Sequence, residues 1–436
     1  MKPILFLCFA ASLHAADFQG WSAQSQREEI RPQFSAEGDH SLVITHDARE
    51  GLDGWFQKRF EVQGGSWQRF SAKRKTRSVD NPRQSCLVRI LWQDPEGKMV
   101  RVDERPVNSD PKLPLPTAEP EYPVDGETDA QGWTSVSGMY RVPSKAARAV
   151  IELHLQWAPG GRVAWRDIEF TPTEEPAAHK VRLAAVHYKP QGKSPRQNCE
   201  EFAPLIADAA RQHADLVVLG ETIPTVSQAK DSVGTAEKIP GPTTDYFSSL
   251  AREHRLHIVL SLYERDGHLV YNTAVLLGPD GTLIGKYRKV SLPPSEAAGG
   301  VAPGKDYPVF NTSLGRIGMM VCYDGFFPEV ARELTKNGAE IIAWPVWGCN
   351  PKLAAARACE NHVYLVSSTF MDSASGWMIS AVYDHNGDVL ATTPRWGSVA
   401  IAEVTLNRPY FGPYNLGDFR SMVPRHRPRT EGQPLK

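Results

Sequence analysis

The sequence predicts two structural units in one chain, an antiparallel β-sandwich followed by an α/β domain. The chain has 436 residues, which is too long for one ordinary domain. Residues 17–170 contain short apolar–polar alternations separated by turn residues, whereas residues 181–405 alternate apolar runs with segments of helical spacing. The polar, proline-containing stretch 171–180 is the expected linker, and residues 406–436 form a C-terminal extension.

The composition favours a folded protein and argues against two classes of partner. Hydrophobic residues make up 41% and charged residues 23%, which allows a sizeable core. Lys and Arg total 49 against 50 Asp and Glu, so a nucleic-acid-binding protein that relies on bulk positive charge is not expected. Beyond the N-terminus no segment approaches the roughly 18 apolar residues that span a bilayer, so no membrane association is expected.

The N-terminus has the pattern of a secretory signal peptide. Met1-Lys2 precedes the apolar run Ile4–Leu13, and the small pair Ala15-Ala16 follows it. We therefore expect residues 1–16 to be removed and the protein to be secreted or periplasmic. The alternative is an ordinary first strand or helix, and the cleavage position stays open.

The cysteines exclude a disulfide framework. Setting aside Cys8 in the apolar run leaves five of the six cysteines, an odd and sparse set for a secreted chain. At least one thiol must stay free. A free thiol in an oxidising compartment is expected to have a chemical function. No CxxC or HxxxH spacing occurs, so no metal is expected.

The first unit shows strand periodicity throughout. Apolar and polar residues alternate over Val150–Trp157, the pattern of a strand with one buried face. The proline-rich stretch 105–132 is expected to be a long surface loop. The expected strands are Ser41–Ile44, Trp55–Val62, Trp67–Thr76, Cys86–Trp92, Met99–Asp103, Thr134–Val142, Val150–Trp157 and Val163–Phe170.

The second unit alternates strands with helices, which is typical of α/β domains with buried strands. Pro328 is expected at the start of a helix and Gly338 at its end. The expected strands are Val181–His187, Asp215–Leu219, Ile258–Tyr263, Thr273–Leu277, Arg316–Val321, Ile341–Pro345 and Val363–Ser368. The expected helices are Asn198–His213, Tyr246–His254, one from Pro328 and Leu353–Asn361.

Three positions are candidates for catalysis. Cys322 lies at a strand-to-helix turn, where a helix end and a nearby cation would lower the pKa of the thiol. Glu221 follows another strand and could act as a general base, and Lys289 could pair with it and stabilise an oxyanion. Each residue also has a purely structural interpretation. Cys322 could be a small buried hydrophobic residue, Glu221 could cap a turn, and Lys289 could be solvated.

Longer stretches around these residues resemble the nitrilase, or carbon–nitrogen hydrolase, superfamily. The resemblance runs from about Val181 to Val404. It includes YNTAVLLGPDGTLIGKYRKVSLP, PGKDYPVF, GRIGMMVCYDGFFPEVARELTKNGAEIIAWP and ARACENHVYLVSS. It implies an αββα sandwich that pairs into homodimers or larger homo-oligomers, with extensions like residues 406–436 packing across the subunit partner. The alternative for this extension is a disordered end.

The resemblance also implies site roles. By motif match, Cys322 would be the nucleophile, Glu221 the general base and Lys289 the oxyanion stabiliser. Glu296 falls where many members have a second active-site glutamate, which orients the lysine or the substrate. The backbone N–H of Tyr323 would complete the oxyanion hole. The reaction would pass through a thioester and need no cofactor.

The residues after the nucleophile narrow the substrate class. The sequence Cys322-Tyr323-Asp324 resembles the amidase and carbamoylase branches, whereas true nitrilases resemble Cys-Trp-Glu. We therefore expect an amide or N-carbamoyl small-molecule substrate. The Trp347 side chain either lines the substrate pocket or packs in the core or in an interface. Arg357 and Glu360 are expected to form a structural ion pair.

The first unit resembles galactose-binding-like β-sandwiches in its overall residue pattern. The stretches that carry this resemblance are WFQKRFEVQGGSWQRFSAKRKTRS and VIELHLQWAPGGRVAWRDIEF. Exposed tryptophans could bind glycan, although Trp67, Trp92, Trp157 and Trp165 are more typical of a sandwich core. A purely structural role, in which the unit covers part of the hydrolase or of its dimer, is equally open. The alternative to an enzyme is a non-catalytic ligand- or carbohydrate-binding protein on a nitrilase-like scaffold. The presence of all three candidate catalytic residues favours the enzyme.

Overall fold

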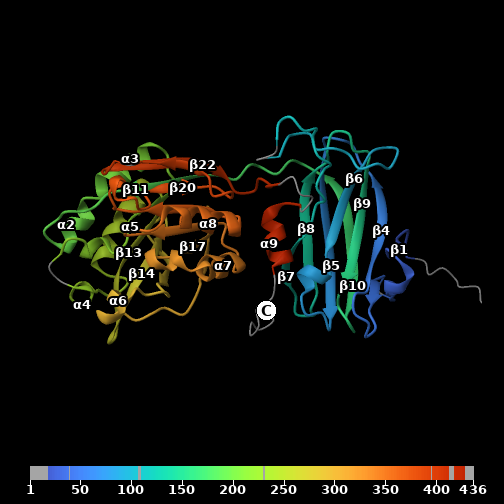
Figure 1. Ribbon diagram of the computed structural model, residues 1–436, viewed down its shortest axis with the longest axis horizontal. Helices are drawn as coiled ribbons and strands as arrows, with labels where there is room; N and C mark the ends of the chain where they lie inside the picture. The colour runs from blue at the N-terminus through green and yellow to red at the C-terminus, as the bar shows by residue number, and fades with distance from the viewer. Residues whose placement is uncertain are drawn as a thin grey trace, which may run out of the picture. The chain divides into compact units, whose positions relative to one another are not determined.

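The computed structural model describes residues 18–38, 40–106, 110–228, 231–393, 395–411 and 417–427. They form two compact units (Figure 1). The front unit comprises the described residues up to Pro176 together with those from Tyr410 onward, and the α/β unit is Ala177–Pro409. The predicted signal peptide, residues 1–16, lies outside the described residues. None of the helices in the described ranges is both long and apolar enough to cross a membrane.

The front unit consists of two antiparallel sheets, as the strand periodicity predicted. Their strand orders are β1-β4-β9-β6 and β2-β3-β10-β5-β8-β7. The strands are β1 (Ser22–Gln24), β2 (Gln33–Ala36), β3 (Leu42–Thr45), β4 (Asp53–Glu61), β5 (Trp67–Arg77), β6 (Val88–Gln93), β7 (Val124–Thr128), β8 (Thr134–Arg141), β9 (Arg148–Gln156) and β10 (Arg162–Thr173). A short helix, α1 (Pro82–Ser85), precedes β6.

The core of the front unit lies between these sheets. Ile151, Leu153 and Leu155 of β9 are fully buried, as the alternation predicted. The expected solvated face is wrong, because Glu152 and His154 are buried as well. Trp92 and Trp165 are also buried in this core. Trp157, however, is 57% exposed. The strand ends before it, and its φ of 52° turns the backbone into the left-handed region.

Two expectations for the front unit are wrong. The stretch 105–132 is not only a surface loop, because it contains strand β7 and the buried residues Glu119 and Glu121. The expected strand Met99–Asp103 is replaced by isolated bridges, Gln93 with Met99 and Arg101 with Thr117. The prolines of this stretch suggested a plain loop, but the segment around Glu121 bridges to the edge strand β6 at Ile90.

The described part of the C-terminal segment folds onto the front unit. It contains helix α9 (Phe419–His426), whose first turn is capped by the Asp418 carboxylate. The Gly417 N–H donates to Glu119 Oε2 at 2.9 Å. The Arg425 guanidinium lies 3.5 Å from the centroid of the Tyr122 ring. The segment is therefore held by a polar anchor and a cation–π contact within the same unit.

The α/β unit contains two six-stranded sheets with orders β15-β14-β13-β12-β11-β22 and β16-β17-β18-β19-β20-β21. The strands are β11 (Lys180–His187), β12 (Leu216–Val218), β13 (His257–Asp266), β14 (Leu269–Leu277), β15 (Leu283–Arg288), β16 (Val309–Thr312), β17 (Gly315–Met319), β18 (Ile341–Pro345), β19 (Tyr364–Ser368), β20 (Ala381–Tyr383), β21 (Val389–Thr392) and β22 (Ser398–Thr405). The helices are α2 (Pro195–Glu200), α3 (Ala203–Arg211), α4 (Ser232–Thr235), α5 (Pro242–His254), α6 (Pro294–Ala298), α7 (Pro328–Lys336) and α8 (Pro351–Asn361).

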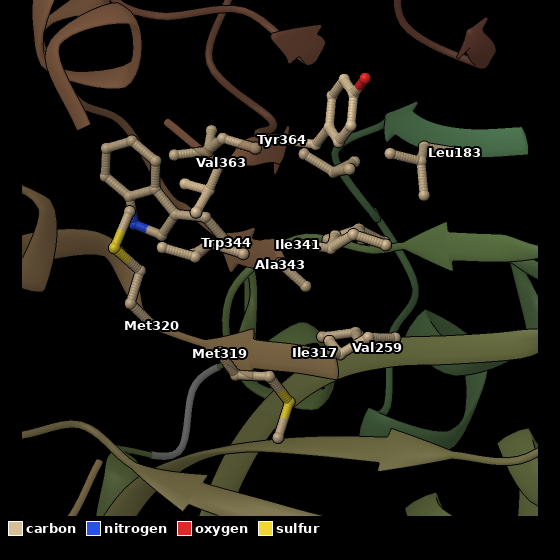
Figure 2. Packing of buried hydrophobic residues seen from close by; sticks show 14 of the residues in the cluster. Leu183, Val259, Ile317, Met319, Met320, Ile341, Ala343, Trp344, Val363 and Tyr364 are labelled. Atoms are coloured by element: carbon tan, nitrogen blue, oxygen red, sulfur yellow. The ribbon is translucent and has the colours of Figure 1, made fainter. Parts of the chain in front are cut away.

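The two sheets pack face to face and helices cover their outer faces. Figure 2 shows Leu183 and Val259 of one sheet in the same apolar cluster as Ile317 and Ile341 of the other. Helices α3 and α5 share a second cluster with the sheet that contains β12 and β13. Helices α7 and α8 contribute apolar residues to the cluster of the other sheet. The resulting order of layers is helix, sheet, sheet, helix.

The helix expected over 198–213 is two helices, α2 and α3. Pro204 lies in the first turn of α3 and has no N–H to donate to the carbonyl of Glu200, so the first helix cannot continue through it. The expected boundaries of α7 are confirmed. Pro328 opens the helix, and Gly338 follows its C-terminus with a φ of 99°.

The buried Glu121 makes the stability of the front unit sensitive to pH. Burial, followed by the charges of Asp418 and Glu119, raises the pKa of its carboxyl from 4.5 to about 8. Between these values the unfolded chain releases the proton and the folded chain keeps it, so the free energy of unfolding falls as the pH rises through this window. We expect Glu121→Gln to be more stable than the natural protein by about 3 kcal/mol at pH 8.

Urea denaturation at pH 5, 6.5 and 8 measures this effect. The free energy of unfolding of Glu121→Gln should depend less on pH than that of the natural protein. The variant Glu127→Gln, at an exposed position, should keep the pH dependence of the natural protein. An unchanged slope in Glu121→Gln would contradict the assignment of the proton to this carboxyl.

Candidate active site

The candidate residues lie at the ends of strands from both sheets of the α/β unit. Glu221 follows β12 and Lys289 follows β15, two strands of one sheet. Cys322 follows β17 and Trp347 follows β18, two strands of the other sheet. Face-to-face packing of the sheets therefore brings residues more than 100 positions apart into one site.

Lys289 is the buried centre of this site. Its Nζ lies 3.0 Å from Glu221 Oε1 and 2.7 Å from Glu296 Oε2, and the residue is 1% exposed. Burial by itself lowers the pKa of the ammonium group, but the neighbouring charges of Glu221, Cys322 and Glu296 raise it above its ordinary value. Lys289 is therefore a permanent cation held between two carboxylates.

Asn272 fixes both carboxylates, and the sequence did not single it out. Its Nδ2 donates to Glu221 Oε1 at 2.8 Å and to Glu296 Oε1 at 2.7 Å. Its Oδ1 accepts from the Ser261 hydroxyl at 3.0 Å, and that hydroxyl accepts from the Thr222 N–H at 2.9 Å. The available signal was a polar residue inside the apolar run YNTAVLL, which in a buried strand must find partners.

Cys322 opens the short 3₁₀-helix η3 (Cys322–Phe326) in an unusual conformation. Its φ of 40° is in the left-handed region, which a non-glycine residue occupies at some cost in energy. Its carbonyl accepts from the Trp344 indole N–H at 3.2 Å. Its Sγ lies 3.9 Å from the carbonyl oxygen of Gly348. These contacts hold the sulfur at the end of the strand.

The thiol is neutral at rest, which corrects the expectation from the sequence. Burial and then the Glu221 carboxylate raise the pKa of Cys322 well above its ordinary value. Lys289 and the N–H of Trp347 act in the opposite direction but do not outweigh them. The helix end and the cation that were expected to lower the pKa are present, but the site is buried and its lysine is already shared by two carboxylates.

Trp347 contributes its main chain to the site. Its backbone N–H donates to Glu221 Oε2 at 2.9 Å, so both oxygens of that carboxylate are held. Its indole is 57% exposed and meets the Phe370 ring edge-on, with centroids 6.4 Å apart. An exposed ring of this kind does not match plain core packing.

Asp324 connects the Cys322 turn to the Lys289 segment. It accepts from the Val321 N–H and the Ser291 N–H, both at 2.9 Å, and from the Tyr287 hydroxyl at 2.8 Å. Burial raises its pKa to about 6. Because Ser291 is two residues from Lys289, this one carboxyl fixes the separation between the thiol and the cation.

The far side of the same turn is fixed by Arg357. Its guanidinium donates to the carbonyl oxygens of Gly325 and Phe326 at 3.1 and 3.3 Å. It also forms the predicted ion pair with Glu360 at 2.9 Å. Tyr323 lies in the first turn of η3, where backbone N–H groups lack an intrahelical acceptor.

Within the described ranges, no group of three His, Cys, Asp or Glu side chains could hold a metal ion. The five cysteines of this part of the chain are all free thiols: Cys86, Cys199, Cys322, Cys349 and Cys359.

Comparison with known proteins assigns the α/β unit to a family. A model of the carbon–nitrogen hydrolase family matches residues 182–410, just over half of the chain. The chain belongs to the carbon–nitrogen hydrolase family. A nitrilase from Pyrococcus abyssi is 38% identical over 195 residues, 43% of this chain and 74% of the relative. The human omega-amidase NIT2 is 30% identical over 250 residues, 52% of this chain and 87% of the relative.

Among solved structures, Nit3 of Saccharomyces cerevisiae, a member of the nitrilase superfamily, aligns with a TM-score of 0.47 and 25% identity. The alignment covers 52% of this chain and 90% of Nit3.

The raised pKa of Cys322 predicts how the carbon–nitrogen hydrolase site reacts with iodoacetamide. Only the thiolate is alkylated, so the rate should still be rising at pH 9. Glu221→Gln removes the charge that disfavours the thiolate and leaves Lys289 in place. We therefore expect alkylation of Cys322 at pH 8 to be about tenfold faster in this variant.

Mass spectrometry of the peptide that contains Cys322 distinguishes it from the other thiols. The exposed Glu253→Gln serves as the matched control and should react like the natural protein. A plateau below pH 8 in the natural protein would mean that Cys322 is already a thiolate and would contradict this assignment.

Proposed function

We propose that the α/β unit is a cysteine-dependent amidase that cleaves non-peptide C–N bonds through a thioester and releases ammonia or an amine. The observation that carries this proposal is the buried arrangement of Glu221, Lys289 and Cys322, with a neutral thiol beside a carboxylate and a fixed cation. Membership of the carbon–nitrogen hydrolase family and the likeness to an omega-amidase support it.

Acylation begins with transfer of the Cys322 proton to Glu221 as the sulfur bonds to the amide carbon. Negative charge develops on the carbonyl oxygen, and the Lys289 ammonium and the N–H of Tyr323 stabilise it. The tetrahedral intermediate collapses when Glu221 returns the proton to the nitrogen. The C–N bond breaks, ammonia or an amine leaves, and the acyl group remains on Cys322.

In deacylation water is the nucleophile and the Cys322 thiol is the leaving group. Glu221 takes a proton from water as its oxygen attacks the thioester carbon, and the same two donors stabilise the oxyanion. The carbon–sulfur bond breaks and the thiol regains its proton. Glu296 and Asn272 act as positioning residues, because they hold Lys289 and Glu221 without adding a second base.

The substrate class, the export, the oligomeric state and the role of the front unit are also proposals. An amide or N-carbamoyl substrate is supported by the sequence Cys322-Tyr323-Asp324. Export is supported by the residue pattern of 1–16, and homo-oligomers by the resemblance to the family. A galactose-binding-like fold of the front unit is supported by its two antiparallel sheets, and its role is either glycan binding or purely structural.

Ammonia release from a panel of amides, N-carbamoyl compounds and nitriles tests the proposal. We expect Cys322→Ala to lower kcat/KM by more than about 1,000-fold, because the nucleophile is lost. The exposed Cys359→Ala is the matched control and should keep full activity.

Turnover of an amide that survives in Cys322→Ala would contradict the thiol mechanism. A natural protein that is inert toward the whole panel, with Cys322 also inert to iodoacetamide, would favour the binding-protein alternative.

A further inference from the structure

Two exposed tryptophans lie next to Gly348, the residue whose backbone carbonyl is near Cys322. The carbonyl oxygen of Gly348 lies 3.9 Å from the sulfur. Trp347 directly precedes it, and Trp377 Cδ2 lies 3.7 Å from the position that a Cβ on Gly348 would occupy. The two tryptophans are 57% and 44% exposed. Large indoles left open to solvent beside a reactive sulfur suggest a surface that binds an apolar group.

Both tryptophans belong to segments that are held in place. The Trp347 ring contacts Phe370, and the Phe370 ring lies 3.0 Å from the Cβ position of Gly220, next to Glu221. The Met378 N–H, next to Trp377, donates to the Cys349 carbonyl at 2.7 Å.

Met371 completes this surface. Its Cγ lies 2.6 Å from the Cβ position of Gly348, so only glycine fits there without a shift. We call Trp347, Phe370, Met371 and Trp377 the aromatic rim. All four lie on segments next to Gly348 or to Glu221.

The charges of the site disfavour an anionic substrate. Lys289 already contacts both Glu221 and Glu296, so the three side chains together carry a net negative charge when ionised. The guanidinium of Arg357 is engaged by backbone carbonyls and by Glu360. Neither of these cations is free to pair with a carboxylate of the substrate.

The burial of Glu221 favours a small leaving group. The nitrogen that departs has to reach Glu221, which is 4% exposed and hydrogen-bonded at both carboxylate oxygens. The acyl group, by contrast, stays on the sulfur, beside the exposed indoles of the rim. The larger part of the substrate is therefore best placed on the acyl side.

We propose that the aromatic rim selects neutral primary amides whose acyl group carries an aromatic ring or a bulky apolar group. This inference rests on the proposed amidase function and adds its substrate class. The indole faces would cover the acyl group while ammonia leaves toward Glu221.

The test compares kcat/KM of the full chain for phenylacetamide, acetamide and the anionic succinamate. We expect phenylacetamide to be preferred over acetamide by about 30-fold, because burial of a phenyl ring accounts for a ratio of this size. Trp377→Ala should lower this ratio about tenfold, mainly through KM, while Trp377→Phe should keep most of it. Trp157→Ala removes another exposed tryptophan, which lies in the front unit, and should leave the ratio unchanged.

The outcomes separate this inference from the function on which it rests. Cys322-dependent hydrolysis of acetamide with no preference for phenylacetamide, or a preference that Trp377→Ala does not reduce, would overturn the role of the rim and leave the amidase proposal in place. A preference for succinamate would also overturn it. Hydrolysis of none of the three amides, with Cys322 inert to iodoacetamide, would count against the amidase itself.

Discussion

The site of this carbon–nitrogen hydrolase depends on one buried cation. A lysine that is 1% exposed is tolerable only if its charge is paired and its hydrogen bonds are made, and Glu221 and Glu296 do both. Removing one partner of such a pair typically costs about 3–5 kcal/mol, because it leaves an uncompensated buried charge. The same pairing fixes the position of the proposed base and oxyanion donor, so stability and chemistry depend on the same contacts.

The surrounding fold serves this arrangement by joining two sheets. Glu221 and Lys289 come from one sheet, and Cys322 comes from the other. Their separation is held by Asp324, which accepts hydrogen bonds from both the Cys322 turn and the Lys289 segment. Strands buried on both faces cannot shift without losing apolar contacts, so the core holds the strand ends from which the site residues emerge. Preorganised donors of this kind stabilise a developing oxyanion most effectively.

Much of this fold could be predicted from local sequence patterns. The alternation over Val150–Trp157 predicted strand β9, and Pro328 with Gly338 predicted the ends of α7. The position of Asn272 between two glutamates could not be predicted, because it depends on packing between segments far apart in the chain. The pKa of Cys322 was predicted in the wrong direction for the same reason: burial and a neighbouring carboxylate are tertiary properties.

In the proposed reaction the acyl group passes through Cys322, and a direct search for the thioester tests this step. An activated p-nitrophenyl ester of the preferred acyl group makes acylation fast, so the intermediate should accumulate. The protein is quenched in acid within milliseconds to seconds, and the peptide that contains Cys322 is weighed by mass spectrometry. We expect a mass increase equal to the acyl group on Cys322 alone. Continued turnover of the ester with an unmodified Cys322 peptide at every time point would contradict it.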